Sequence, residues 1–196
     1  MSVEEKSKPT RELLLVTTGL YLCYVHFQKY LKIVCDKFVI PVIRNRVNVS
    51  QFAYVPGAGK GTVVALTLMY LQLLRYLDKK SGVVRVTAVD LSKAFDSLTH
   101  KSIIDACVGF NLPKPIVLWV MSYLSDRRQC VTLNGNVSSL VTVTRGVPQG
   151  SVIGPLLFSL VIDSLSLSCE NSCFVKYADD LTILHFFRDV LDDRLQ

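Results

Sequence analysis

Apolar residues follow two different periods along the chain, and these periods predict both helices and strands. Apolar residues at helical spacing predict helices over 30–40, 62–78, 100–110, 115–124 and 155–167. Continuous β-prone runs predict strands at 83–89, 130–133 and 137–143, and on both sides of 178–179. The elements do not alternate in a strict βαβ rhythm. The pattern therefore favours an α+β fold, in which an antiparallel sheet has helices packed on one face.

Two of the predicted helices have a defined apolar stripe. In the first helix, which Pro41 is expected to end, the stripe comprises Tyr30, Leu31, Val34, Phe38 and Val39. In the helix over 62–78, the stripe comprises Leu66, Met69, Leu73, Leu74 and Leu77. Such stripes are typical of helices that pack one face on a core.

The dipeptide Asn134-Gly135 separates the β-prone runs 130–133 and 137–143. Asn-Gly is the strongest short-range signal for a two-residue turn, because both residues tolerate positive φ. The sequence therefore predicts a β-hairpin there. Arg127 and Arg128 precede it, and they are candidates to grip a template backbone, although a solvated turn explains them equally well.

Composition indicates an intracellular chain that can form a sizeable core. The 196 residues, half of them hydrophobic, suffice for one large domain or two small ones. The net charge of +6 is consistent with an anionic partner such as nucleic acid. The six cysteines have no disulfide-framework or zinc spacing, so we expect them to be reduced. The apolar stretch 13–27 is too short for a membrane helix, and no signal peptide is evident.

Two adjacent carboxylates, Asp179 and Asp180, lie between two short β-prone runs. A tight turn at Ala178-Asp179 would place both acids at the tip of a hairpin. Neighbouring like charges repel, and a bound cation is the usual reason to keep them together. Mg²⁺ is typically bound by one or two carboxylates together with substrate phosphates. The run predicts a metal-binding hairpin, with a solvated acidic turn as the alternative.

A third carboxylate, Asp90, stands at the end of the predicted strand 83–89. Sheet pairing could bring Asp90, Asp179 and Asp180 together. Three such acids could bind two divalent ions about 3.5–4 Å apart, which is the arrangement used for in-line phosphoryl transfer. Positioning and charge would then supply most of the catalysis.

The segment 145–158 combines three glycines with a central Gln149. Gly146, Gly150 and Gly154 let a backbone approach a ligand closely. The Gln149 amide offers donors and an acceptor toward a sugar or base. Taken alone, this segment is simply a flexible loop before a helix.

Together, these three motifs resemble those of LINE-type (non-LTR retrotransposon) reverse transcriptases. The resemblance runs from about Lys29 to Phe186 and covers the palm and part of the fingers of that right-hand polymerase fold. It is tightest in the runs 88–98, 145–158 and 174–184. It implies an RNA-directed DNA polymerase that uses an RNA template, a DNA primer, dNTPs and two Mg²⁺ ions, for which Mn²⁺ can substitute. It also implies a location in the nucleus or cytoplasm.

The resemblance also implies roles for individual residues. Asp90 and Asp179 would be metal ligands, with Asp180 as the third acid and the Leu91 carbonyl facing a metal. Phe95 would contact the incoming sugar and reject a 2′-hydroxyl. Gln149 and Gly150 would line the dNTP pocket. Tyr177 would contact the primer end.

The chain departs from the family pattern at both ends. The family's Arg-Pro-Ile-Ser-type fingers segment has no match in 12–26, and the thumb is expected to be missing. We predict a divergent segment over 1–28, partial fingers over 29–82 and a palm over 83–196. We expect weak or no activity from this chain alone. The alternative is an inactive retroelement remnant that binds nucleic acid at most nonspecifically.

A third interpretation is a nucleotide kinase, because the run from Pro56 to Thr62 looks like a phosphate-binding loop. Two features argue against it. Tyr54 occupies the position of the first glycine, and the preceding residues 45–51 are largely polar rather than a buried strand. LINE-type enzymes have a Gln-Phe-x-Tyr/Phe-x-Pro-Gly segment that Gln51 to Gly57 matches. We expect Lys60 to be a solvated loop lysine, with a contact to phosphate or template as the alternative.

Overall fold

A computed structural model describes residues 21–55, 57, 60–78, 82–133, 136–166 and 171–187, without the side chains of 21–26 and 132–133. Most of the unmatched segment 12–26 and the turn at Asn134-Gly135 therefore lie outside the described residues or side chains. No helix in the described part of the chain is long and apolar enough to span a bilayer.

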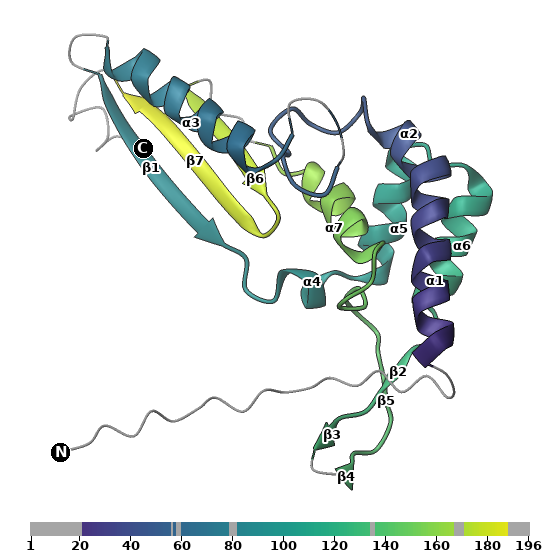
Figure 1. Ribbon diagram of the computed structural model, residues 1–196. Coiled ribbons are helices and arrows are strands. Elements are labelled where there is room, and N and C mark those ends of the chain that lie inside the picture. Colours follow the sequence, from purple (N-terminus) through teal and green to yellow (C-terminus); the bar gives the residue numbers. More distant parts are fainter. Residues whose placement is uncertain are drawn as a thin grey trace, which may run out of the picture.

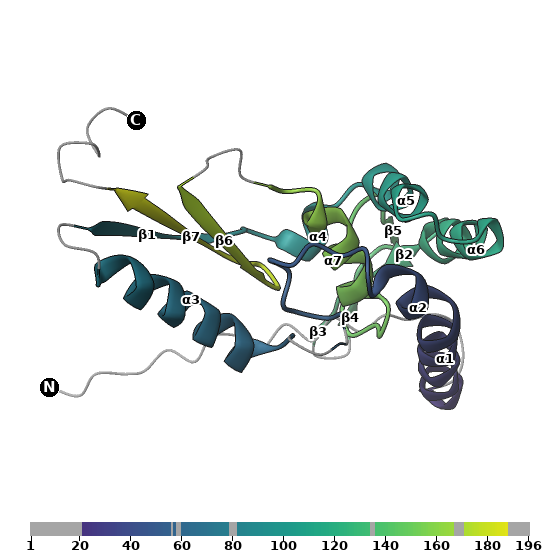
Figure 2. The ribbon, with the colours of Figure 1, turned by 90° about the horizontal axis from the view of Figure 1, so that it is seen from above.

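The sheet that contains the acidic hairpin has three antiparallel strands. β1 (Val83–Asp90), β7 (Asp180–Phe187) and β6 (Ser172–Tyr177) lie in the order β1-β7-β6. The helix α3 (Thr62–Leu77) runs along one face of this sheet (Figures 1 and 2). This arrangement confirms the predicted α+β fold with an antiparallel sheet, and β1 ends on Asp90 as expected.

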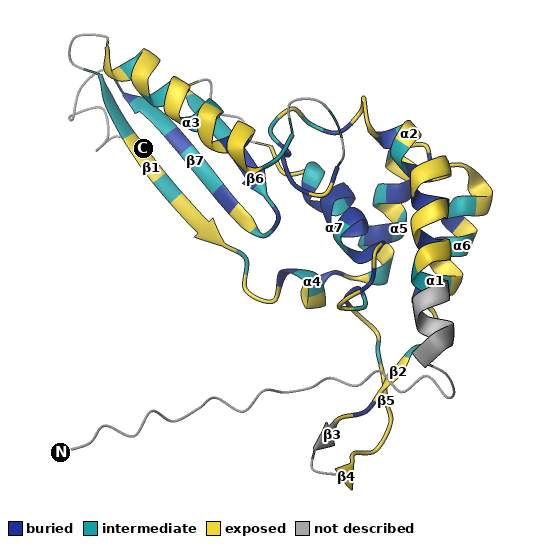
Figure 3. Cartoon of the chain, viewed as in Figure 1, coloured by how far each residue is buried: buried dark blue, intermediate teal, exposed yellow. Residues whose placement is uncertain are grey.

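A helical layer adjoins the end of the sheet that carries the turn between β6 and β7 (Figure 1). At its centre lies α7 (Gly154–Asp163), which is buried on all sides (Figure 3). A helix that is apolar all round is typical of a domain core. Around it lie the other helices, which are α1 (Tyr21–Val34), α2 (Ile40–Ile43), α4 (Ala94–Ser97), α5 (His100–Gly109) and α6 (Lys114–Leu124).

The predicted hairpin at 130–143 is confirmed as a thin ribbon that projects from the helical layer (Figure 1). It consists of two short ladders, one between β2 (Arg128–Gln129) and β5 (Val141–Thr142), the other between β3 (Thr132–Leu133) and β4 (Asn136–Val137). The boundary predicted at residue 28 lies within α1, and the division into three segments stays a prediction.

The four cysteines that the described side chains include are all free thiols, at positions 35, 107, 130 and 173. Burial is the largest cause that raises the pKa of the Cys35 and Cys107 thiols to about 11. Such thiols stay protonated and behave as small apolar core residues. These four free thiols agree with the reduced state that we expect, which stays a prediction for the chain.

The prediction that Pro41 ends the first helix is wrong. Between α1 and α2 the chain forms a π-helical turn, η1 (Cys35–Val39), in which the amide of Ile40 donates to the carbonyl of Cys35. The wider turn shifts the hydrogen-bond pattern, so that Pro41, which has no amide hydrogen, lies in the first turn of α2. The predicted stripe is also partly wrong, since Tyr30 and Phe38 are exposed.

The apolar face predicted for α3 is wrong in most of its residues. Leu66, Leu74 and Leu77 are exposed, whereas Ala65 is buried. Ala65 packs with Phe52 and Val175 on the sheet, and the residues that surround this small cluster are Leu68, Met69, Cys173 and Tyr177. The helix is apolar on more than one side, so its sequence alone does not select the face that contacts the sheet.

A buried lysine connects the sheet to the helical layer. Lys176 on β6 is fully buried, and its Nζ donates to the carbonyls of Ile162 (3.2 Å), Asp163 (3.0 Å) and Leu165 (2.9 Å) at the end of α7. The Ile162 carbonyl also accepts from the Leu165 amide (3.1 Å). Carbonyls at the end of a helix lack donors within the helix, and a cation suits the negative end of the helix dipole. This contact coincides with the end of α7 at Asp163, short of the predicted residue 167.

Replacing Lys176 by Met tests this connection. Met has a similar unbranched shape but cannot donate, so buried carbonyls at the end of α7 lose their partner. We expect the free energy of unfolding to fall by at least about 2 kcal/mol in urea denaturation. Lys101→Met, which removes an exposed lysine paired with Asp105, is the control and should change stability little. Equal effects of both variants would show that Lys176 has no special anchoring role.

Candidate active site

Two of the three predicted acids face each other across the sheet. In the antiparallel register of β1 and β7, Asp90 lies directly opposite Asp180. Residues directly opposite on antiparallel strands project from the same face, with Cα atoms about 4.5–5.5 Å apart. Both side chains are exposed. The pairing therefore brings together two carboxylates that come from segments 90 residues apart in the sequence.

The third acid, Asp179, lies in the turn next to this pair. Tyr177 pairs with Asp180, so the turn consists of Ala178 and Asp179, as the sequence predicted. Ala178 is buried and has a left-handed φ of 55°. A two-residue turn with positive φ matches the twist of the strands that it joins. The three acids are thus adjacent along one end of the sheet.

The described acids do not form a closed metal cage. No group of three or more acidic, histidine or cysteine side chains in the described part of the chain is arranged to bind a metal ion. The donor chemistry nevertheless fits Mg²⁺, which takes one or two carboxylates and completes its shell with water and substrate phosphates. Asp90 and Asp180 supply such an open pair.

Phe95 has a defined position on α4, the short helix that follows β1. Its ring stacks on Phe158 of α7, with ring centroids 4.6 Å apart, and meets the edge of Tyr54 at 6.2 Å. Phe95 is only half-buried, so part of its ring remains accessible. Leu91, which follows Asp90, packs against the core that includes α7. The residues after Asp90 are therefore anchored on the central helix.

Two tyrosines lie close to the acidic turn. Tyr177 pairs with Asp180 across β6 and β7, and Tyr54 lies near both Tyr177 and Asp179. The Thr62 hydroxyl donates to the Tyr177 hydroxyl at 2.8 Å, which connects the start of α3 to the end of β6. Burial raises the pKa of Tyr54, and the negative charge of Asp179 and the nearby Tyr177 raise it further. Tyr54 itself has a left-handed φ of 62°. The segment before α3 therefore reaches the acidic turn.

The glycine-containing segment 145–151 docks on the chain that follows Asp90. The amide of Gly146 donates to Leu98 (2.7 Å), and that of Val147 donates to Phe95 (3.1 Å). Gly146 has a φ of 79°, and a Cβ there would come within 2.9 Å of the Asp96 Cα. We expected these glycines to let the backbone approach a ligand closely. At Gly146 the close approach is to the chain's own backbone, at Asp96.

Gln149 and Gly150 lie at the exposed end of this segment. The Gln149 side-chain amide donates to both carboxylate oxygens of Asp96, at 3.3 and 3.4 Å. These long bonds fix the direction of the amide weakly. Gly150 has a φ of 75°, a conformation that favours glycine.

Arg127 and Arg128 lie apart from the acids, where the β2–β5 ribbon begins (Figure 1). The Arg127 guanidinium lies 5.4 Å from the centroid of the Tyr123 ring on α6. Arg128 is exposed on β2. The structure therefore assembles the acids, Phe95 and Tyr177 at one end of the sheet, and the two arginines on the ribbon.

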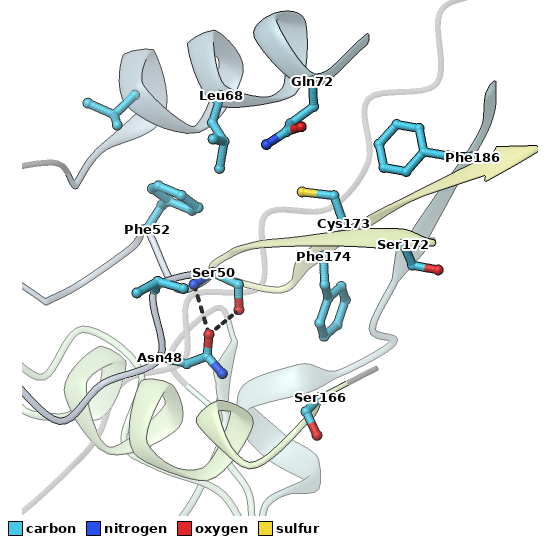
Figure 4. Close-up of a pocket in the computed structure, with 12 residues that line it drawn as sticks. Asn48, Ser50, Phe52, Leu68, Gln72, Ser166, Ser172, Cys173, Phe174 and Phe186 are labelled. Carbon is cyan, nitrogen blue, oxygen red and sulfur yellow. Dashed lines mark hydrogen bonds between the residues drawn. The ribbon is translucent and has the colours of Figure 1, made fainter. Parts of the chain in front are cut away.

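A cavity of about 690 Å³ lies between α3 and β6 (Figure 4). It is lined mainly by apolar side chains, among them Phe52, Leu68 and Phe174, together with Asn48 and Ser50. None of the three acids lines it. This cavity is therefore separate from the acidic end of the sheet.

Comparison with known proteins identifies the family. The family model described as reverse transcriptase (RNA-dependent DNA polymerase) matches residues 22–196. The chain belongs to the reverse transcriptase family. The resemblance to LINE-type enzymes is confirmed, and the two strands, the acidic turn and the docked segment are elements of a reverse transcriptase domain.

Curated relatives of this reverse transcriptase domain include retrotransposon proteins. It is 28% identical over 138 residues to a retrovirus-related Pol polyprotein of type-1 retrotransposable element R2 from Popillia japonica, a match that spans 63% of this chain and 22% of the relative. It is 36% identical over 132 residues to a probable RNA-directed DNA polymerase of transposon X-element from Drosophila melanogaster, spanning 65% and 14%. The chain thus spans a small part of its relatives.

Solved structures with the same fold include telomerases. Apo telomerase from Candida Tropicalis, truncated from its C-terminal domain, has a TM-score of 0.57 at 12% identity, with 90% of this chain and 39% of that chain covered. Telomerase from Candida albicans in complex with a fragment of telomeric RNA has a TM-score of 0.58 at 12% identity, with 87% and 34% covered. At this identity the likeness shows the fold alone, and it confirms a right-hand polymerase fold.

The features that suggested a kinase loop have other roles in this reverse transcriptase domain. We expected Lys60 to be a solvated loop lysine, and this prediction is wrong. Its Nζ donates to the carbonyls of Asn48 (3.2 Å) and Gln51, and burial lowers its pKa. Lys60 therefore connects two parts of the segment before α3, because its ammonium group donates hydrogen bonds to the carbonyls of Asn48 and Gln51.

Sequence reasoning missed three residues that organise the site. Thr62, Lys176 and Tyr54 act through contacts with segments far away in the sequence, so no local pattern identifies the partners of Thr62 and Lys176. Tyr54 was noticed only as an obstacle to a phosphate loop. The one local signal for a role of Tyr54 in the site was its position within the segment from Gln51 to Gly57, which matches LINE-type enzymes.

Gly146→Ala tests the docking of the segment 145–151 on the chain after Asp90. The new methyl group would collide with the Asp96 backbone, and its residue would have a strained positive φ. We expect a loss of about 1–3 kcal/mol in the free energy of unfolding. Gly109→Ala is the matched control, because nothing lies within 4 Å of the Cβ position there. If both variants unfold at the same urea concentration, the docking is not as tight as described.

Proposed function

We propose that this chain carries the polymerase site of an RNA-directed DNA polymerase, which transfers dNTPs to a primer 3′-hydroxyl on an RNA template. The observation that supports this function best is the pairing of Asp90 with Asp180 beside Asp179. An exposed pair of like charges directly opposite each other is unfavourable without a cation. Its presence at a strand end, in a chain of this family, is best explained by catalysis.

Asp90, Asp179 and Asp180, with the carbonyl of Leu91, would bind two Mg²⁺ ions, for which Mn²⁺ can substitute. Bound there, the ions would supply charge neutralisation at the triphosphate and a more acidic primer hydroxyl. The protein residues would do the positioning. The acids would orient the reacting phosphate. The packing of Leu91 on the core and of Phe95 on α7 would keep Asp90 aligned with the strand that carries Asp180.

The remaining predicted residues would bind the substrates. Phe95 would contact the incoming sugar and reject a 2′-hydroxyl, because its ring is held by Phe158 and Tyr54 and cannot move away. Gln149 and Gly150 would line the dNTP pocket once the weak bonds from Gln149 to Asp96 open.

Contacts with the primer and the template complete the proposal. Tyr177, whose hydroxyl accepts a hydrogen bond from Thr62, would contact the primer end. Arg127 and Arg128 would contact the template from the ribbon. The reaction would take place inside the cell, in the nucleus or cytoplasm, where retroelement RNA is available.

Primer extension on an RNA template tests this proposal. We expect the folded chain to extend a DNA primer weakly with Mg²⁺ or Mn²⁺, and Asp179→Asn to reduce the rate at least about 100-fold. Asp36→Asn, which removes an exposed acid on η1, is the control and should leave the rate unchanged. The same rate in Asp179→Asn, or no extension by folded protein, would refute catalysis by this chain.

A further inference from the structure

A second cavity, of about 450 Å³, lies where the ribbon meets the segment 145–151. Three cationic side chains line it, and they come from three different segments: Lys93 before α4, Arg127 before β2, and Arg145 after β5. Asp96 is the one acid among the described residues that line it. The cavity therefore concentrates positive charge, although no one stretch of the sequence contains a basic cluster.

The backbone that carries these charges has a defined conformation, and no salt bridge among the described residues neutralises them. Lys93 has a fixed left-handed φ of 53°, and Arg145 is bridged by its backbone to Thr99. Arg127 lies over the ring of Tyr123. The Asp96 carboxylate accepts bonds from Gln149. Within the described part of the chain, the salt bridges involve other lysines, so the three cations remain available to an anion.

We infer that this cavity binds a backbone phosphate of a nucleic-acid strand, an inference that rests on the proposed polymerase function. Lys and Arg are the side chains that neutralise phosphates, and Arg can donate to two phosphate oxygens at once. The cavity thus provides the phosphate contact that the ribbon had been expected to make. It adds Lys93 and Arg145 to that contact, whereas Arg128 does not line the cavity and would contact the template elsewhere on the ribbon.

A strand phosphate fits the cavity better than a nucleoside triphosphate. Gln149 lines this cavity as well as the proposed dNTP pocket, so the two sites would adjoin. A triphosphate, however, would be bound with its metal ions at the acidic turn, and none of Asp90, Asp179 and Asp180 lines this cavity. In addition, a row of aromatic rings begins beside Arg127. Tyr123 stacks with Trp119 at 6.3 Å and with Phe27 at 6.4 Å, and Phe27 is 44% exposed. Cations beside aromatic rings are typical of surfaces that bind single strands.

The salt dependence of RNA binding tests this assignment. The full chain is titrated with a fluorescein-labelled oligouridylate, without metal or nucleotides, and anisotropy gives the affinity over a series of KCl concentrations. Each phosphate contact contributes about 0.7 to the slope of log K against log[KCl] for a single strand. We expect Lys93→Gln, Arg127→Gln and Arg145→Gln each to reduce the slope by up to this amount. Lys114→Gln, which removes an exposed charge at the start of α6, should leave the slope unchanged.

A second titration separates the two sources of phosphate. Each variant, checked for folding by circular dichroism, is also titrated with a fluorescent dNTP and Mg²⁺, and we expect its affinity for the dNTP to be unchanged. Variants that weaken dNTP binding but keep the RNA slope would identify a triphosphate site and overturn the inference. Three other results would also overturn the inference. They are a slope in all variants equal to that of the unaltered chain, a reduction of the slope in Lys114→Gln as large as in the three cavity variants, and no RNA binding by the unaltered chain. Because this assay involves no catalysis, primer extension can fail or succeed independently.

Discussion

The antiparallel pairing of β1 with β7 is the constraint on which the candidate site depends. This pairing joins Val83 to Phe187 at one end and Asp90 to Asp180 at the other. Side chains alternate between the faces of a sheet, and Leu181 packs on the helical core while Leu184 lies on the opposite face, the face of Asp180. A shift of one residue would exchange the two faces and would separate the two acids. Burial of these leucines on β7 therefore also fixes the position of the carboxylates. Core packing and the geometry of the site have the same physical cause.

The helical layer keeps this register aligned with the rest of the domain. α7 is in contact with Phe95 through Phe158, and with β6 through Lys176 and its three carbonyl partners. Both sides of the acidic end are thus attached to the same buried helix. The segment 145–151, which precedes α7, closes on the chain after Asp90 through the close approach at Gly146. A substrate at the acids would meet residues that are already ordered by these contacts.

The sequence predicted those parts of the site that have a local signal. Strand 83–89 with its terminal Asp90 and the turn at Ala178-Asp179 follow from apolar runs and short-range turn chemistry. Pro41 was misread, because a π turn in η1 shifts the hydrogen bonds before it, and that turn depends on packing around Cys35 and Val39. The face of α3 was misread, because Leu66 and Leu77 are as apolar as Leu68 and Met69. The role of Lys176 has no local signal, since its acceptors lie at the end of a helix that was predicted to extend to residue 167 and ends at Asp163.

We propose that Asp90 and Asp180 are kept opposite each other because they share a cation. A double-mutant cycle of Asp90→Asn and Asp180→Asn, measured by urea denaturation, tests it most directly. In EDTA the pair should be mutually repulsive by about 0.2–1 kcal/mol, so that either single variant is more stable than the parent chain. With millimolar Mn²⁺ and a dNTP present, the coupling should become favourable, and only the parent chain should gain stability. A coupling energy that is the same in both conditions would contradict a shared metal site.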